Sequence, residues 1–182
     1  MRLLPDGTDA EDREAEKHQG EAKMKSADAE GKILVSACLA GRHCRYDGKE
    51  KEIPEIARLV AEGRMIPVCP ESAGGLMIPR EPSEIRGDRV FSKSGKEVTA
   101  EYQEGARRCL KVCQMHHCGM AVLKSKSPSC GKGCIHNGKF DGGLVEGNGV
   151  FAQMCLDHGI EVLTEDEFLA DPAVFMDGTD VR

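Results

Sequence analysis

Short aliphatic runs alternate along the chain with longer segments whose apolar residues recur at helical spacing. Four of the runs predict buried strands, at residues 32–38, 65–70, 120–126 and 160–164. The intervening segments predict helices at 53–63, 99–119 (with Thr99 as N-cap) and 149–159, and residues 90–98 resemble a hairpin that turns at Ser94 and Gly95. Pro67 argues against a central position for the second strand. The alternation predicts an α/β domain on an open, mostly parallel sheet with a small hairpin insertion.

The first 31 residues differ from the rest of the chain in charge. They hold nine acidic and five basic side chains, so most of the formal net charge of -6 lies there. The segment lacks the apolar core of a secretory signal, and its acids argue against a transit peptide. We expect a disordered tail at 1–31, a folded domain at 32–168 and a C-terminal tail at 169–182.

Charge and hydropathy argue against two classes of partner. An acidic chain is a poor general nucleic-acid binder, because such binding depends on clustered lysines and arginines that release counterions. No apolar run approaches the roughly 20 residues that cross a bilayer. We therefore expect neither membrane association nor stable nucleic-acid binding.

The nine cysteines carry the strongest chemical signal. Without an export signal they indicate a reducing compartment, the cytoplasm, where metal binding or catalysis is a more common role than disulfide formation. Cys38 ends the first predicted strand, Cys69 ends the second, and Cys130 lies four residues beyond the third. Ligands of open parallel sheets bind outside the carboxyl ends of the strands. The three positions therefore predict a shared metal or cluster site.

The spacing of the cysteines bears on which metal they hold. The chain has no C-x2-C pair, the usual unit of a structural zinc site. Three dispersed thiolates suit an iron–sulfur cluster at least as well as a catalytic zinc ion with an open position. Cys109 and Cys113 stand four residues apart near two histidines, but with Tyr102 and Ala106 they form a stripe typical of core packing.

Several motifs occur together in one order: "ILVSACLAG", "CRYDG", "IPVCPESAGGLMIPREPSEI", "VTAEYQEGA", "LKSKSPSCG", and "NGKF" followed by "EGNGVFAQM". In this the chain resembles the bacterial thiouracil desulfidase family over about residues 32–168. The resemblance implies a Rossmann-like, three-layer iron–sulfur desulfidase domain. It also implies a [4Fe-4S] cluster held by three cysteines and hydrolytic removal of sulfur from 4-thiouracil-type bases, giving uracil and hydrogen sulfide.

The same motifs imply roles for individual residues. By resemblance the cluster ligands are Cys38, Cys69 and Cys130, and the catalytic residues are Glu71 and Ser127, with Ser129 as the alternative to Ser127. From the residues alone, Glu71 could instead cap a helix, and the two serines could be ordinary loop residues.

The roles of other residues within these motifs are not fixed by the sequence. Arg80 and Glu84 could orient the substrate base or form a plain ion pair, and Cys44 is expected either to be structural or to lie next to the cluster ligands without binding the cluster.

Two further functions stay open at the level of the sequence. A non-catalytic iron–sulfur or zinc-binding protein would use four cysteines, with Cys134 as the fourth ligand. A sulfurtransferase would carry sulfur as a persulfide on one reactive cysteine. For the desulfidase, a thiouracil base or nucleotide is expected in preference to tRNA, because the chain is acidic.

Overall fold

A computed structural model describes residues 31–172 and 175. Apart from Gly31, the tail expected at 1–31 lies outside the described residues, as does most of the segment expected as a C-terminal tail. None of the helices in the described part of the chain is long and apolar enough to cross a membrane.

Four parallel strands form the central sheet in the order β2-β1-β5-β8. They are β1 (Ile33–Ser36), β2 (Met65–Val68), β5 (Met120–Leu123) and β8 (Glu161–Thr164). All four lie within predicted strands, and the α/β class with a parallel sheet is confirmed. β2 is an edge strand, which agrees with the presence of Pro67. Proline has no backbone N–H to donate, so it suits a strand that pairs on one side only.

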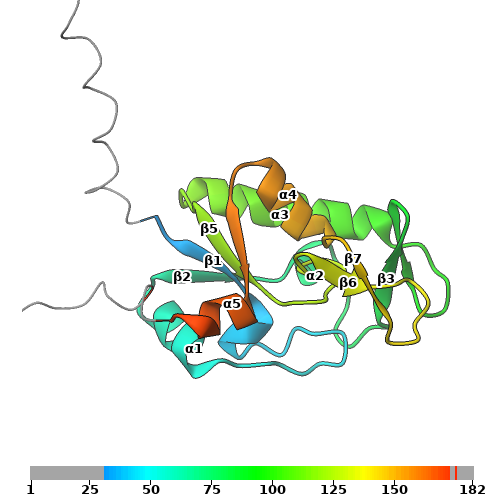
Figure 1. The fold of residues 1–182 in the computed structure, drawn as a ribbon, viewed down its shortest axis with the longest axis horizontal. Coiled ribbons are helices and arrows are strands. Elements are labelled where there is room, and N and C mark those ends of the chain that lie inside the picture. Colours follow the sequence, from blue (N-terminus) through cyan, green and yellow to red (C-terminus); the bar gives the residue numbers. More distant parts are fainter. Residues whose placement is uncertain (1–30, 173–174, 176–182) are drawn as a thin grey trace, which may run out of the picture. The chain divides into compact units, whose positions relative to one another are not determined.

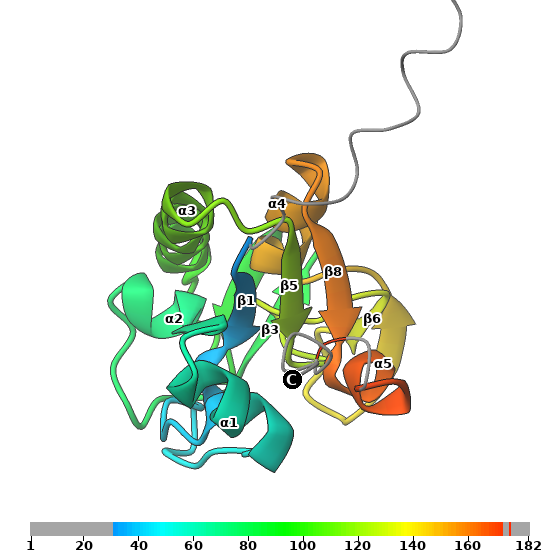
Figure 2. The ribbon, with the colours of Figure 1, turned by 90° about the vertical axis from the view of Figure 1, so that its left-hand side faces the viewer.

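Helices cover both faces of the sheet, which makes three layers (Figure 1). The helices α3 (Thr99–Met115) and α4 (Val150–Asp157) lie on one face, and α1 (Pro54–Ala61) and α5 (Glu165–Ala170) on the other. Each face of the sheet carries a hydrophobic core, and successive strand residues point to opposite faces. Leu34 and Leu123 pack with α3 and α4, whereas Val35 and Val122 pack with α1 and α5. Figure 2 shows the strands between these layers.

Two small antiparallel hairpins supplement the parallel sheet. One pairs β3 (Ser83–Arg86) with β4 (Arg89–Ser92), and the other pairs β6 (Cys134–His136) with β7 (Leu144–Glu146). The hairpin turn expected at 90–98 is confirmed, because Ser92 N donates to Lys96 O at 2.8 Å and Val98 N donates to Val90 O at 2.9 Å. Its second arm is not a strand, since Glu97 meets Phe91 only through an isolated bridge, and β4 forms its ladder with the preceding β3. The chain turns at Gly95, whose N–H donates to Ser92 O at 2.9 Å.

Several boundaries also differ from the prediction: the helix expected at 99–119 ends at Met115, and the strand expected at 120–126 ends at Leu123. The first strand stops at Ser36, and Cys38 lies in a short 3-10 helix, η1 (Ala37–Ala40). Thr99 is the first residue of α3 rather than its N-cap, because its hydroxyl accepts the Val90 N–H and donates to Glu97. The first strand was predicted too long because Ala37 and Cys38, which follow it, are as apolar as the residues within it.

A close contact between two helices fixes the segment after β2. The four-residue helix α2 (Pro70–Ala73) packs on α3 at Gly105, where a Cβ atom would collide with the Pro70 carbonyl. Only glycine permits this approach. The contact sets the position of the α2 backbone, which carries Glu71.

Candidate active site

A cavity of about 410 Å³ lies where the strands of the sheet end. Its volume is in the range of small-molecule sites. Its lining comes from the carboxyl ends of β1, β2 and β5 on one side and from both hairpins on the other. The polar and sulfur-bearing residues of the lining are Ser36, Cys38, Cys44, Arg45, Tyr46, Cys69, Glu71, Arg80, Ser83, Glu84, Lys93, Tyr102, Lys124, Ser125, Lys126, Ser127, Cys130 and His136.

Cys38, Cys69 and Cys130 all line this cavity, as their places at the strand ends predict. Cys38 is in η1 after β1, Cys69 directly follows β2, and Cys130 lies seven residues after β5. All nine cysteines of the chain are free. The structure therefore brings the three predicted ligands to one cavity, while their role as ligands stays a prediction.

Cys44 is a fourth thiol in the same cavity. Interaction with Cys38 and burial raise the pKa of Cys44 to about 11, although Cys69 acts in the opposite direction. The Cys69 thiol lies 3.8 Å from the Cys44 carbonyl and accepts a hydrogen bond from Ser72 Oγ at 3.4 Å. The Cys44 thiol and burial raise the pKa of Cys69 above its usual range. Cys44 thus lies in direct contact with two of the three predicted ligands.

The loop that carries Cys130 is held from behind by α4. The first N–H groups of α4 donate to the carbonyls of this loop: Val150 N to Pro128 O at 2.9 Å, and Phe151 N and Ala152 N to Ser129 O at 2.8 and 3.1 Å. A helix leaves its first N–H groups without intrahelical partners, and here the loop satisfies them. The contact fixes the backbone of the "SPSC" segment without using any of its side chains.

Glu165 holds the beginning of the same loop. Its carboxylate accepts hydrogen bonds from Ser125 N at 2.6 Å and Ser125 Oγ at 2.8 Å and pairs with the Lys124 ammonium. Burial acts to raise the pKa of Glu165, but these donors outweigh it and lower the pKa overall. Glu165 opens α5, so the last helix is tied to the loop that leads to Cys130.

The two serines of the loop have different surroundings. Ser127 lines the cavity, and its Oγ accepts the Ser129 N–H at 3.0 Å and the Cys130 N–H at 3.1 Å. With its oxygen so engaged, the hydroxyl hydrogen of Ser127 remains available to donate. Ser129 is fully buried, does not line the cavity, and its Oγ has no hydrogen-bond partner among the described residues. Of the two candidates, only Ser127 is placed to meet a ligand in the cavity.

Glu71 lies in the first turn of α2 and forms an ion pair with Arg80. Arg80 Nε and Nη2 lie 2.7 and 2.6 Å from the same carboxylate oxygen, Oε2. The side chains of Arg80 and Glu71 are only 9% and 15% exposed. Burial acts to lower the pKa of Arg80, but the Glu71 charge more than offsets this and raises it. The side chain of Glu71 therefore points to Arg80.

The partner of Arg80 is thus Glu71 and not Glu84. Glu84, which also lines the cavity, accepts a hydrogen bond from Phe140 N at 3.0 Å and so joins the two hairpins. Tyr102, from α3, lies beside Glu71, and burial and then the Glu71 charge raise the pKa of its hydroxyl above the usual range.

His136 is a lining residue that the sequence did not single out. It ends β6, and its Nδ1 is buried without a hydrogen-bond partner among the described residues. The three-residue strand β6 is too short to show a periodic pattern, so no sequence signal identified it.

Cys134, the candidate fourth ligand, does not line the cavity. It begins β6, where its Cα faces Glu146 of β7. Within the described residues, no group of three or more Cys, His, Asp or Glu side chains could hold a single metal ion. A tetrahedral zinc site requires all its ligands at roughly 2.0 to 2.3 Å from one atom. A four-iron cluster spreads its thiolates over separate irons, so three dispersed cysteines around a cavity fit a cluster better than they fit zinc.

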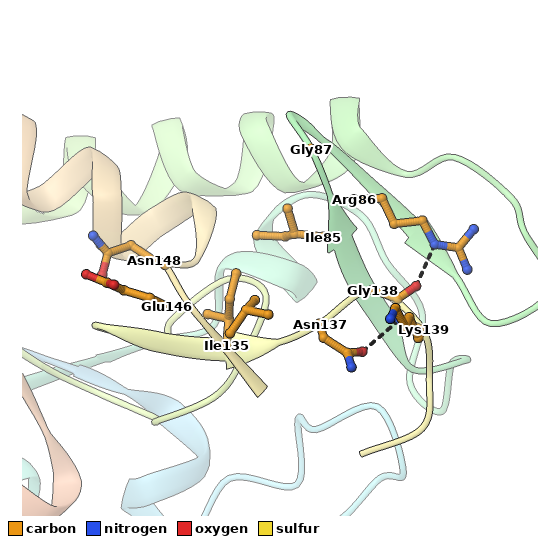
Figure 3. A pocket seen from close by; sticks show the side chains of 11 residues that line it. Ile85, Arg86, Gly87, Ile135, Asn137, Gly138, Lys139, Glu146 and Asn148 are labelled. Carbon is orange, nitrogen blue, oxygen red and sulfur yellow. Dashed lines mark hydrogen bonds between the residues drawn. The ribbon is translucent and has the colours of Figure 1, made fainter. Parts of the chain in front are cut away.

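A second hollow of about 620 Å³ lies between the two hairpins (Figure 3). Three of its five polar side chains, those of Arg86, Asn137 and Asn148, are occupied within the chain. Arg86 Nε donates to Gly138 O at 2.6 Å, Asn137 Oδ1 accepts Lys139 N at 2.9 Å, and Asn148 Oδ1 accepts Gly133 N at 2.7 Å. No buried polar atom that lacks a partner lies among its described lining residues. The hollow therefore gives no sign of a ligand.

The remaining buried cysteines lie away from the cavity. Cys109, Cys113 and Cys155 come from α3 and α4, and Cys118 follows α3; all four belong to the apolar core under these helices. Tyr102, Ala106, Cys109 and Cys113 are all at most 2% exposed, so the predicted packing stripe on α3 is confirmed.

Known proteins are similar to this chain over most of its length. Residues 33–167 match the family model described as 2-thiouracil desulfurase. The uncharacterized protein YbbK of Bacillus subtilis is 39% identical over 145 residues, which cover 74% of this chain and 96% of that protein. The solved structure of a [4Fe-4S]-dependent thiouracil desulfidase, TudS, is 44% identical with a TM-score of 0.75 and covers 81% of this chain and 99% of its own.

Proposed function

Since this chain belongs to the 2-thiouracil desulfurase family, we propose that it removes sulfur from a thiouracil-type base with a [4Fe-4S] cluster as cofactor. One observation carries the assignment of the site: Cys38, Cys69 and Cys130 line a single cavity together with Glu71 and Ser127. The free state of all nine cysteines fits a cytoplasmic protein, because reducing conditions keep thiols unpaired.

Cys38, Cys69 and Cys130 would hold the cluster. When bound through three thiolates, a four-iron cluster supplies one iron without a protein ligand, a soft Lewis acid that suits a thiocarbonyl sulfur. The fit rests on the donor set, since three thiols from three separate strand ends face the cavity. Cys134 lies outside that lining, which argues against Cys134 as a fourth ligand.

The reaction exchanges a C=S bond for a C=O bond by hydrolysis. Water adds its oxygen to the ring carbon and gives up two protons, and sulfur leaves with two protons as hydrogen sulfide, so no oxidant or reductant is required. Glu71 is the group in the cavity suited to move these protons, because its Oε1 is not held by Arg80. A carboxylate there can accept a proton from the water and return it to the sulfur.

Ser127 binds and orients the reacting groups. Its oxygen is held by two backbone N–H groups, so its hydroxyl hydrogen can donate to the ring oxygen or to the water. A persulfide on Cys130 itself is disfavoured because burial raises the pKa of that thiol well above its usual range. A nucleophilic thiol needs the opposite shift.

The test is an anaerobic assay of the reconstituted protein with 4-thiouracil and its nucleotide. Iron and sulfide are counted per chain, and hydrogen sulfide and uracil are then measured together. Equal amounts of both products over many turnovers, with no added acceptor, support hydrolysis. Sulfur retained on the protein after one turnover would indicate the persulfide carrier. A loaded cluster with no release of sulfide would leave only a binding role.

A further inference from the structure

Arg80 connects three separate segments beside the cavity. Its guanidinium binds Glu71 Oε2 of α2, Cys44 O at 2.9 Å, and Met77 O at 3.2 Å. Its own backbone N–H donates to Tyr46 O at 2.8 Å. Thus one side chain at the cavity wall joins α2 to the loop that carries Cys44 and Tyr46.

The geometry of the Arg80–Glu71 pair is unusual for a plain structural pair. Two guanidinium nitrogens converge on one carboxylate oxygen, Oε2, instead of sharing the two oxygens in the usual bidentate way. Oε1 is left without this partner. The arrangement fixes the orientation of the carboxylate and keeps one oxygen for another partner.

Local structure alone does not fix the Glu71 side chain. Helix α2 has only four residues, and Gly105 anchors its backbone rather than its side chains. A glutamate side chain has three rotatable bonds, and holding it in one conformation requires a tertiary contact. Among the described residues, Arg80 is the only one that forms an ion pair with it, and the Tyr102 hydroxyl is a second, uncharged neighbour of its carboxylate.

We propose that Arg80 is a positioning residue for the desulfidation, which acts on the reaction through Glu71 by aiming Oε1 at the bound substrate. This inference rests on the proposed function. Arg80 does not itself move a proton. Misplacement of a reacting group by about 1 Å can cost a factor of roughly 100 in rate, which is the size of effect expected here.

A double-mutant cycle in the cluster-loaded enzyme tests the proposal. Arg80→Gln is expected to lower kcat about 100-fold with little change in KM and with iron per chain at the parent's level. Arg80→Lys keeps the charge but cannot bridge the same acceptors, so it should recover only part of the rate. In the Glu71→Gln background, Arg80→Gln should change kcat less than about twofold, because coupled residues are not additive.

The matched control is Arg89→Gln. Arg89 forms an exposed ion pair with Glu97 at 3.4 Å, away from the cavity lining, and its loss should leave kcat unchanged. Independent, multiplied effects of Arg80→Gln and Glu71→Gln would overturn the proposal. So would a loss of iron in Arg80→Gln as large as its loss of activity, since that would make Arg80 a support for the cluster site alone.

Crystal structures of the cluster-free parent and Arg80→Gln give a readout that does not depend on turnover. One orientation of the Glu71 carboxylate in the parent and several in the variant support the proposal. The same single orientation in both overturns it, whatever the activity of the parent. Failure of the parent to release sulfide would instead refute the proposed function, so the two failures are distinguishable.

Discussion

Cys130 and Cys113 are buried thiols of the same apolar cluster, with exposures of 6% and 0%. They differ in the surroundings of their sulfur atoms. Cys130 lies at the wall of the cavity, with Ser36 and Glu71 among its neighbours, and its loop is held by α4. Cys113 faces other core cysteines, and its thiol donates to Cys118 O at 3.3 Å.

This difference teaches that burial of a cysteine carries little information about its role. Five of the nine cysteines belong to the one core cluster. Only the topological position separates them, because the carboxyl ends of parallel strands open onto a cavity whereas a helix face packs on the sheet. The following experiments test whether cysteines at the strand ends and cysteines in the helix core have different roles.

The largest effect is expected for the cavity cysteines. Cys130→Ala, and likewise Cys38→Ala or Cys69→Ala, should lose most of the bound iron and more than about 100-fold in activity, because even residues that only support metal ligands cost 10- to 100-fold when removed. Iron and sulfide per chain after anaerobic reconstitution measure this. Cys134→Ala is the control and should keep its cluster. A cluster retained in Cys130→Ala would show that Cys130, like Cys113, is not a cluster ligand.

Glu71→Gln should keep the cluster and lose about 100-fold or more in kcat, because an amide cannot transfer the proton that a carboxylate does. Glu104→Gln is the matched control on an exposed face, where Glu104 pairs with Arg108 at 2.8 Å. Full activity in Glu71→Gln, with the cluster loaded, would remove this carboxylate from the mechanism.

Among substitutions of the two serines that precede Cys130, Ser127→Ala should lower the rate about tenfold more than Ser129→Ala. Ser127→Ala removes a donor from the cavity and the acceptor of two N–H groups, and should also lower the free energy of unfolding by about 1 to 2 kcal/mol. Ser129→Ala should keep its rate and its stability, because its buried Oγ has no partner to lose within the described residues. The reverse order of rates would exchange their roles.

Cys113→Ala and Cys155→Ala should leave iron content and kcat unchanged while lowering the free energy of unfolding by about 1 kcal/mol each. The cost comes from the small void left in the core by the sulfur. Denaturant unfolding of the cluster-free protein measures it. Loss of iron in either variant would contradict a purely structural role for the helix-face cysteines.

The smallest expected effect is an absence of labelling. Burial, with smaller contributions from neighbouring thiols, raises the pKa values of Cys109, Cys118 and Cys155 to about 12. At pH 8 such a thiol is ionised in roughly one molecule in 10⁴, and only the thiolate is alkylated. Iodoacetamide and mass spectrometry of the folded, cluster-free protein should therefore find these three unmodified. Rapid labelling of Cys155 would show that the core opens.

The parallel sheet and the gathering of Cys38, Cys69 and Cys130 were predictable because both follow from periodicity and topology. Apolar runs mark the strands, and strand ends share one edge of a sheet. Helices 53–63 and 149–159 were predicted to within two residues at each end, since their apolar spacing is regular.

Other features depend on contacts that no local pattern reveals. Strands β6 and β7 have only three residues each, too few for a periodic pattern. The β3–β4 hairpin is different, because its two-residue turn at Gly87 and Asp88 is a local signal that the prediction missed. The choice of Glu71 over Glu84 as the partner of Arg80 is set by the position of α2 on Gly105. The difference between Ser127 and Ser129 arises from α4, whose N-terminus draws in the Ser129 carbonyl and buries the side chain.

The bond between Glu165 and the loop at Ser125 bears on how the protein is made. A ribosome adds roughly 5 to 20 residues per second, so Cys38, Cys69 and Cys130 are all synthesised before Glu165, whose carboxylate anchors the loop of Cys130. Strand β8, which pairs with β5, is also made after them. The three thiols are therefore present in the nascent chain before all the contacts that fix their positions have formed. The loop that carries Cys130 thus reaches its final geometry only when the domain is complete, and a chain truncated before residue 165 would lack the Glu165 anchor of that loop.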